Sequence, residues 1–90
     1  MRDFRMLIDG RLVEGEGTFD VLNPATEQVL AAAPYASSTQ LDTAVAAANA
    51  AFPAWAATPV AARKAAILAM AERIDEHRDE LARLLTQEQG

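Results

Sequence analysis

The first third of the chain alternates apolar and polar residues over short runs, which is the period of β-strands. Two of these runs, Met6–Ile8 and Arg11–Val13, flank Asp9 and Gly10. This pair tolerates the positive φ angles of a two-residue type I′ turn, so the pattern predicts a β-hairpin. Residues 14–17, which alternate Glu and Gly, are expected to form a flexible acidic loop after it.

Two further runs, 18–22 and 27–33, read as strands on either side of the segment 23–26, which has the sequence Asn-Pro-Ala-Thr. Asn can accept a hydrogen bond from the backbone ahead of it and Pro fixes φ, so this segment is expected to turn. Pro34 is expected to close the last strand. Residues 1–36 are therefore predicted to form a small antiparallel β-meander.

From Ser37 onward the apolar residues recur every three or four positions, which is the period of an α-helix. Ser37 and Gln40 have the spacing of a capping box, so the first helix is expected to begin near Ser38. Pro53 is expected to end it, because proline has no N–H to donate within a helix.

Thr58 and Pro59 are expected to open the next helix, with Thr58 as the cap and Pro59 at the first helical position. Its apolar stripe, spaced seven residues apart, consists of Val60, Ile67, Ile74 and Leu81. A helix continuous to residue 86 would be about 42 Å long, too long for so small a domain, so a break is expected at 77–79. Residues 37–90 are thus predicted to form two to three Ala-rich helices, which makes the fold class α+β.

The composition shows that many of the apolar side chains are too small to fill a core. Apolar residues are 51% of the 90, which excludes a disordered tail, but 21 of those 46 residues are alanine. A chain of this size buries only about 60% of its unfolded surface even with ordinary residues. The chain is therefore expected to be an incomplete fold that packs against something else.

The charge balance excludes several classes of partner. Thirteen acidic residues against eight basic ones give a net charge of −5, and no basic stripe is present for nucleic acid. The sequence contains no run of 18 apolar residues, the length needed to cross a membrane. The N-terminus does not have the pattern of a signal peptide, so a cytoplasmic location is expected. The absence of cysteine excludes disulfides, thiolate metal sites and a cysteine nucleophile from these 90 residues.

Chemistry-bearing side chains are few, and their surroundings favour ordinary roles. His77, the single histidine, lies among charged residues of 72–80 with no second ligand type nearby, which favours a solvated helix histidine over a base or metal ligand. The carboxylates of the same segment read as a polar helix face, where Asp75 would pair with Arg78. From the residues alone, no catalytic machinery is expected.

Six short motifs follow one another over nearly the whole chain. They are Leu7-Ile8-Asp9-Gly10, Phe19-Asp20-Val21-Leu22-Asn23-Pro24-Ala25-Thr26, Leu41-Asp42-Thr43-Ala44-Val45-Ala46-Ala47-Ala48, Ala51-Phe52-Pro53-Ala54-Trp55, Pro59-Val60-Ala61-Ala62-Arg63 and Asp79-Glu80-Leu81-Ala82 through Thr86-Gln87-Glu88-Gln89-Gly90. In this order and spacing they resemble the N-terminal segment of the aldehyde dehydrogenase superfamily. In that superfamily the last of these motifs continues beyond the residue that matches Gly90, so the chain is expected to be an N-terminal fragment.

The resemblance implies an incomplete part of an α/β cofactor-binding domain, in an enzyme that oxidises aldehydes to carboxylic acids with NAD or NADP. In that family a cysteine attacks the carbonyl, hydride passes to the nicotinamide, and a glutamate activates the water that releases the acid. These groups lie further along a longer chain. The segment itself is therefore expected to bind no cofactor, to be inactive alone, and to pack against the remainder of the enzyme or to self-associate through exposed apolar faces.

One site of the family maps onto this segment. Several members hold a structural monovalent cation, and by position its ligands here would be the backbone carbonyls of Val21 and Leu22 and the carboxylate of Glu88. Oxygen ligands suit a hard cation. The alternative is that Glu88 is a solvated acid in the last turn of a helix.

Two other functions stay open at this point. The chain could be a stand-alone interaction module that docks on a larger dehydrogenase or on another protein. It could also be a small enzyme of its own, whose chemistry would then have to come from Glu, Asp or His77.

Overall fold

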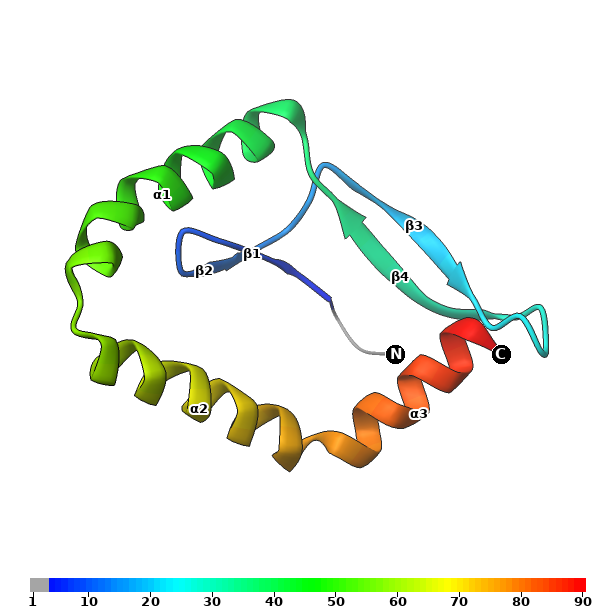
Figure 1. Ribbon diagram of the computed structural model, residues 1–90. Helices are drawn as coiled ribbons and strands as arrows, with labels where there is room; N and C mark the ends of the chain where they lie inside the picture. Colours follow the sequence, from blue (N-terminus) through cyan, green and yellow to red (C-terminus); the bar gives the residue numbers. More distant parts are fainter. Residues whose placement is uncertain (1–3) are drawn as a thin grey trace.

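Residues 4–90 are described by a computed structural model, in which four strands are followed by three helices (Figure 1). The strands are β1 (Met6–Ile8), β2 (Arg11–Val13), β3 (Gly17–Leu22) and β4 (Val29–Tyr35). The helices are α1 (Ser38–Ala57), α2 (Val60–Glu76) and α3 (Arg78–Gln89). The predicted α+β class is confirmed. The first three residues of the predicted unit 1–36 lie outside the described residues.

The first hairpin forms as its turn residues predict. β1 and β2 pair antiparallel, with Ile8 opposite Arg11. Asp9 has a φ of 52° and Gly10 a φ of 73°, so both central residues are left-handed, as a type I′ turn requires.

The second hairpin joins β3 to β4, with Gly17 opposite Tyr35 at its open end. Its turn begins at Asn23, whose side-chain Oδ1 accepts a hydrogen bond from the backbone N–H of Ala25 at 3.0 Å. The predicted bond from Asn to the backbone ahead is therefore present.

Two details of the predicted β-region are corrected. The four strands form two separate antiparallel pairs rather than one continuous meander. The strand expected over 27–33 begins two residues later and runs through Pro34. Glu27 has a φ of 62°, which no strand accommodates. Pro34, opposite Thr18, is tolerated because β4 has only one neighbouring strand and can turn its missing donor outward.

Gly15, before β3, and Gly17, the first residue of β3, pack closely against Tyr35, and the flexibility expected of 14–17 stays a prediction. The N–H of Glu16 donates to the carbonyl oxygen of Tyr35 at 2.9 Å. A Cβ added to Gly15 would collide with the backbone of Tyr35, and one added to Gly17 would collide with the Tyr35 ring and hydroxyl. The segment is therefore held against the end of β4.

Helix α1 begins as predicted and ends later than predicted. The Ser37 hydroxyl accepts from the N–H of Gln40 at 3.0 Å, and the Gln40 side chain accepts from the N–H of Ser37 at 2.9 Å, which completes the capping box. Pro53 lies inside the helix, which continues to Ala57. The fixed φ of proline is itself helical, so Pro53 removes one hydrogen bond without forcing the chain out of the helix.

The start of α2 is one residue from its predicted place. Thr58 ends α1 instead of capping α2, because its hydroxyl turns back to donate to the carbonyl of Ala54 at 2.8 Å. Pro59 takes the cap position, and its carbonyl accepts from the N–H groups of Ala62 and Arg63 at 3.0 and 3.1 Å. The break predicted at 77–79 is confirmed, since His77 separates α2 from α3.

The elements surround an open middle. The three helices and the β3–β4 pair follow one another around a perimeter, and the β1–β2 hairpin lies inside it, where β1 packs against α1 (Figure 1). The radius of gyration is 16.7 Å, whereas a compact domain of this length has one of about 12 Å. Among residues 4–90, the single buried hydrophobic residue is Ala31. No closed core holds this arrangement together.

Candidate docking surface

The large apolar side chains of the described residues are mostly exposed. Leu7 is 71% exposed, Val60 70% and Phe52 65%. The total accessible area is 7349 Å², whereas a compact protein of 9.6 kDa has about 5,100 Å². The difference, about 2,200 Å², exceeds the area that both partners together bury in a typical stable protein–protein interface. Large apolar side chains exposed together, as they are here, mark a candidate interaction surface.

Helix α1 presents apolar or small residues on most of its circumference, whereas α2 carries charged residues beside an apolar stripe. No residue of either helix is buried, so the stripe of Val60, Ile67 and Ile74 on α2 is exposed as well. Helix α3 separates its apolar and polar faces more clearly. A helix with small or apolar residues on nearly all sides suits coverage from more than one side, so α1, together with the apolar stripe of α2, is the main part of the docking surface.

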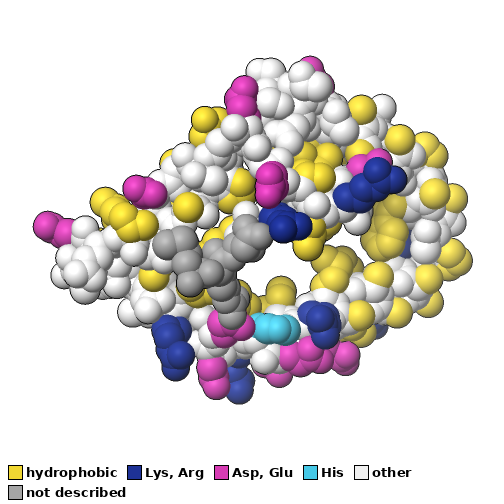
Figure 2. All heavy atoms as spheres, turned by 180° about the vertical axis from the view of Figure 1, so that it is seen from behind, with side chains coloured by type: hydrophobic (Ala, Val, Ile, Leu, Met, Phe, Trp, Pro, Cys, Tyr) yellow, Lys and Arg dark blue, Asp and Glu magenta, His cyan; other side chains and the backbone are white. Residues whose placement is uncertain are grey.

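Small residues also line a groove between α1 and the first hairpin. Its walls come from Leu7 and Ile8 on β1 and from four alanines of α1, which are Ala44, Ala47, Ala48 and Ala51. Figure 2 shows, from behind, an opening at the centre of the molecule with hydrophobic side chains along much of its edge. Side chains as short as alanine let another backbone approach closely.

Both strand pairs add unpaired edges to this surface. Each sheet in the described part of the chain has two strands, so each strand has one neighbour and one open side. The N–H and C=O groups along an open side are ready to pair with a further strand.

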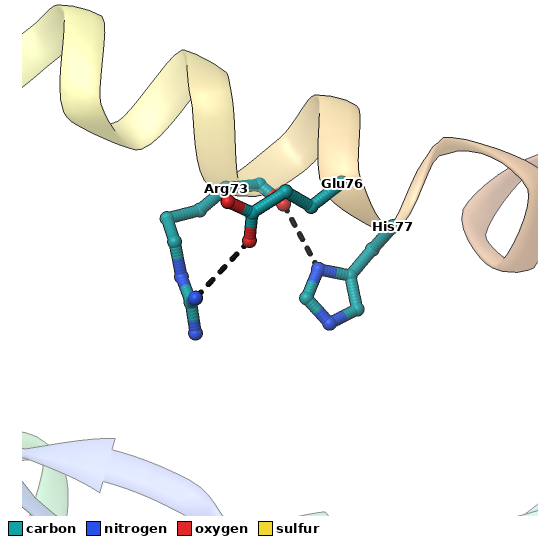
Figure 3. A network of polar contacts seen from close by, with 3 residues as sticks. All are labelled: Arg73, Glu76 and His77. Carbon is teal, nitrogen blue, oxygen red and sulfur yellow. Dashed lines mark hydrogen bonds and ion pairs between the residues drawn. The ribbon is translucent and has the colours of Figure 1, made fainter.

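His77 and the charged residues around it form a network of polar contacts on the surface. The Nδ1 of His77 lies 2.9 Å from the carbonyl oxygen of Arg73, and Arg73 pairs with Glu76 at 3.1 Å (Figure 3). The predicted pair of Asp75 with Arg78 is present at 3.6 Å. All these side chains are exposed, and no group of three or more His, Cys, Asp or Glu residues that could hold a metal occurs between residues 4 and 90.

The residues predicted to bind a cation come from two elements that meet. Val21 and Leu22 lie on either side of a register shift at the end of β3, and Glu88 lies in the last turn of α3. The end of α3 reaches the turn that follows Leu22, because a Cβ built on Gly90 would stand 3.5 Å from the Cγ of Pro24. Cation binding by these three residues stays a prediction.

One contact, between Gln40 and Glu14, could be predicted only in part from the sequence. The Gln40 side chain reaches from α1 to the carbonyl of Glu14 at 2.8 Å. Its spacing from Ser37 predicts the cap, but nothing in the sequence indicates this second partner.

In the described residues no helix combines the length and the apolar composition needed to cross a membrane. The cytoplasmic location stays a prediction.

Known proteins resemble this chain over nearly all of its length. It is 40% identical over 88 residues to the mitochondrial methylmalonate-semialdehyde/malonate-semialdehyde dehydrogenase [acylating] of Rattus norvegicus, covering 96% of this chain and 16% of the relative. It is 45% identical over 85 residues to malonate-semialdehyde dehydrogenase 1 of Geobacillus thermodenitrificans, covering 92% and 18%. The crystal structure of an NAD-dependent benzaldehyde dehydrogenase from Corynebacterium glutamicum superimposes with a TM-score of 0.85 and 39% identity, over 92% of this chain and 19% of that one.

The chain thus spans less than a fifth of the length of these relatives. The model of the aldehyde dehydrogenase family matches residues 12–90, which include all of β3 and β4, the last two residues of β2 and all three helices. This match confirms the resemblance carried by the six motifs. The chain belongs to the aldehyde dehydrogenase family and corresponds to its N-terminal segment.

Proposed function

We propose that this chain is the N-terminal scaffold segment of an NAD(P)-dependent dehydrogenase that oxidises aldehydes to carboxylic acids. The observation that carries the proposal is the exposed apolar surface of a segment at least 39% identical to much longer dehydrogenases. The segment contributes no catalytic side chain and holds no cofactor. The remainder of the enzyme supplies the cysteine, the glutamate and the nucleotide-binding loops.

The partner of the docking surface is, in this proposal, that remainder. The excess area of about 2,200 Å² suits a permanent contact within one folded unit rather than a passing encounter. The open edges of β1–β2 and β3–β4 support the same partner, because an edge strand left bare would pair with other chains and aggregate. The NAD dependence named for the Corynebacterium enzyme supports NAD as the cofactor of the whole protein.

The test begins with the gene. The reading frame is followed beyond the Gly90 codon, the continuous product is expressed, and NAD(P)H formation is measured by absorbance with a panel of aldehydes. We expect a frame that continues to a cysteine in a glycine-rich setting, and turnover that the 90-residue chain alone does not show.

A stop codon directly after Gly90, together with a cooperatively melting monomer of 90 residues, contradicts the proposal. The chain would then be a stand-alone interaction module. Its partner could be sought among full-length dehydrogenases by a direct binding measurement.

A further inference from the structure

The hydrogen-bond pattern changes at the residue between α2 and α3. The backbone N–H of His77 donates to the carbonyl of Ile74 at 3.1 Å, three residues back, rather than to that of Arg73, four residues back. The carbonyl of His77 accepts from the N–H of Leu81 at 2.9 Å, which is the first bond of α3. One residue, with φ −108° and ψ 16°, therefore ends one helix and begins the next.

The side chain of His77 restores the bond that its own backbone does not make. Its Nδ1 lies 2.9 Å from the carbonyl oxygen of Arg73, the acceptor that a continuous helix would have given to the backbone N–H of His77 (Figure 3). A carbonyl oxygen can only accept, so a hydrogen bond between these two atoms requires the proton on Nδ1. The last turn of α2 is closed by an imidazole instead of an amide.

The far end of α3 depends on the direction that this joint gives it. Gly90 abuts Pro24 in the β3–β4 turn, and one cavity is lined jointly by Leu30, Ala31, Leu84 and Glu88. The 12 residues of α3 span about 18 Å, so a rotation of about 10° at His77 moves the far end by about 3 Å. That displacement would separate the end of α3 from the hairpin turn.

We propose that His77 is a positioning residue, whose Nδ1–H bond to the carbonyl of Arg73 fixes the angle between α2 and α3. Through that angle it holds the end of α3 on the β3–β4 turn. The neighbouring ion pairs, Arg73 with Glu76 and Asp75 with Arg78, are exposed on both sides and contribute little to the joint. The inference does not depend on the proposed function. It concerns the joint at His77 between α2 and α3, and the contact of the end of α3 with residues 23–28.

Two amide substitutions test the bond with matched chemistry. In His77→Asn the side-chain nitrogen stands the same number of bonds from Cα as Nδ1, so it can donate to the carbonyl of Arg73. In His77→Gln the nitrogen stands one bond further and overshoots. Hydrogen–deuterium exchange is measured by mass spectrometry on the full-length protein, in peptides that cover 73–82 and, separately, 22–30.

We expect exchange in His77→Gln to be about fivefold faster in 73–82, as loss of one typical hydrogen bond gives, and also faster in 22–30. We expect His77→Asn to stay within about twofold of the unsubstituted protein in both peptides, a fraction of that effect. Equal acceleration in both variants would overturn the proposal. So would acceleration in 73–82 with no change in 22–30, because the bond would then be a local cap that positions nothing.

A measurement on the unsubstituted protein keeps the proposal testable if His77→Gln fails to fold. Nitrogen-15 NMR of labelled histidine, recorded at alkaline pH where the ring is neutral, distinguishes the two tautomers. His77 is the single histidine of these 90 residues, and its signal is identified by its loss in His77→Asn. The Nδ1–H tautomer is expected, and the Nε2–H tautomer would overturn the proposal.

Discussion

Gln40 joins the first turn of α1 to the segment between β2 and β3. Its Nε2 donates to the carbonyl of Glu14 at 2.8 Å, while its Oε1 accepts from the N–H of Ser37 at 2.9 Å. One side chain therefore completes a helix cap and also contacts Glu14, which lies 26 positions earlier in the chain. A substitution at residue 37 weakens the cap while it leaves the contact of Gln40 with Glu14 in place.

Ser37→Ala removes the acceptor for the N–H of Gln40 and leaves the contact to Glu14 in place. We expect the opening free energy of the first turn of α1 to fall by about 1 kcal/mol, measured by native-state hydrogen exchange in the full-length protein. Ser37→Asp retains an acceptor and should lose less than half as much. Equal losses for the two variants would show that the cap is not what stabilises this turn.

The two glycines beside Tyr35 should respond to alanine differently. A Cβ on Gly15 meets the backbone of Tyr35, which cannot move without breaking the bond from the N–H of Glu16. A Cβ on Gly17 meets the ring and hydroxyl of Tyr35, which can rotate away. We expect Gly15→Ala to cost about 2–3 kcal/mol and Gly17→Ala about 1 kcal/mol, from urea denaturation midpoints. The reverse order would contradict the packing described.

Gly10 tests the cost of a left-handed backbone without a clash against another part of the chain. No atom beyond its two chain neighbours lies within 4 Å of a Cβ built there, and its φ is 73°. Gly10→Ala should therefore cost about 1 kcal/mol through the left-handed conformation alone. Asp9→Asn, the matched control, should change stability by less than about 0.5 kcal/mol, because Asn also tolerates positive φ. A neutral Gly10→Ala would mean that the turn rearranges.

Phe52 tests whether the docking surface is covered. It is 65% exposed in this segment, so Phe52→Ala should change the stability of the 90-residue chain by less than about 1 kcal/mol. In the full-length protein we expect a loss of about 3 kcal/mol or more, as for a core phenylalanine. Thermal melting of both forms gives the comparison, with Glu72→Ala on α2 as the exposed polar control. Equal, small effects in the two forms would show that Phe52 is not covered in the full-length protein either.

Features decided within a few residues could be predicted from the sequence. The turn at Asp9 and Gly10 and the capping box at Ser37 each depend on side chains no more than three positions apart. Errors arose where two local preferences compete. Thr58 can cap the helix that follows it or turn back to the helix that precedes it, and the bond to Ala54 prevails.

Relations between distant parts could not be read in the same way. The sequence of the four strands does not indicate whether the two hairpins join into one sheet. In the structure they form two separate pairs. The contact of Gly90 with Pro24 links residues at opposite ends of the chain, so it depends on the angles of every joint between them. The docking surface could be expected from the first alanine-rich helix, because a helix with small residues on nearly all sides is covered on more than one side.

The two hairpins differ from the closure at Pro24 in the length of chain that must be brought together. Each hairpin closes over a short turn and can form within microseconds. Bringing Gly90 to Pro24 closes more than sixty residues, and its loss of chain entropy is larger by about 2 kcal/mol. During synthesis both strand pairs can therefore form before the end of α3 reaches Pro24. That late closure is the step at which a nascent chain would be captured by a chaperone or by another unfinished copy.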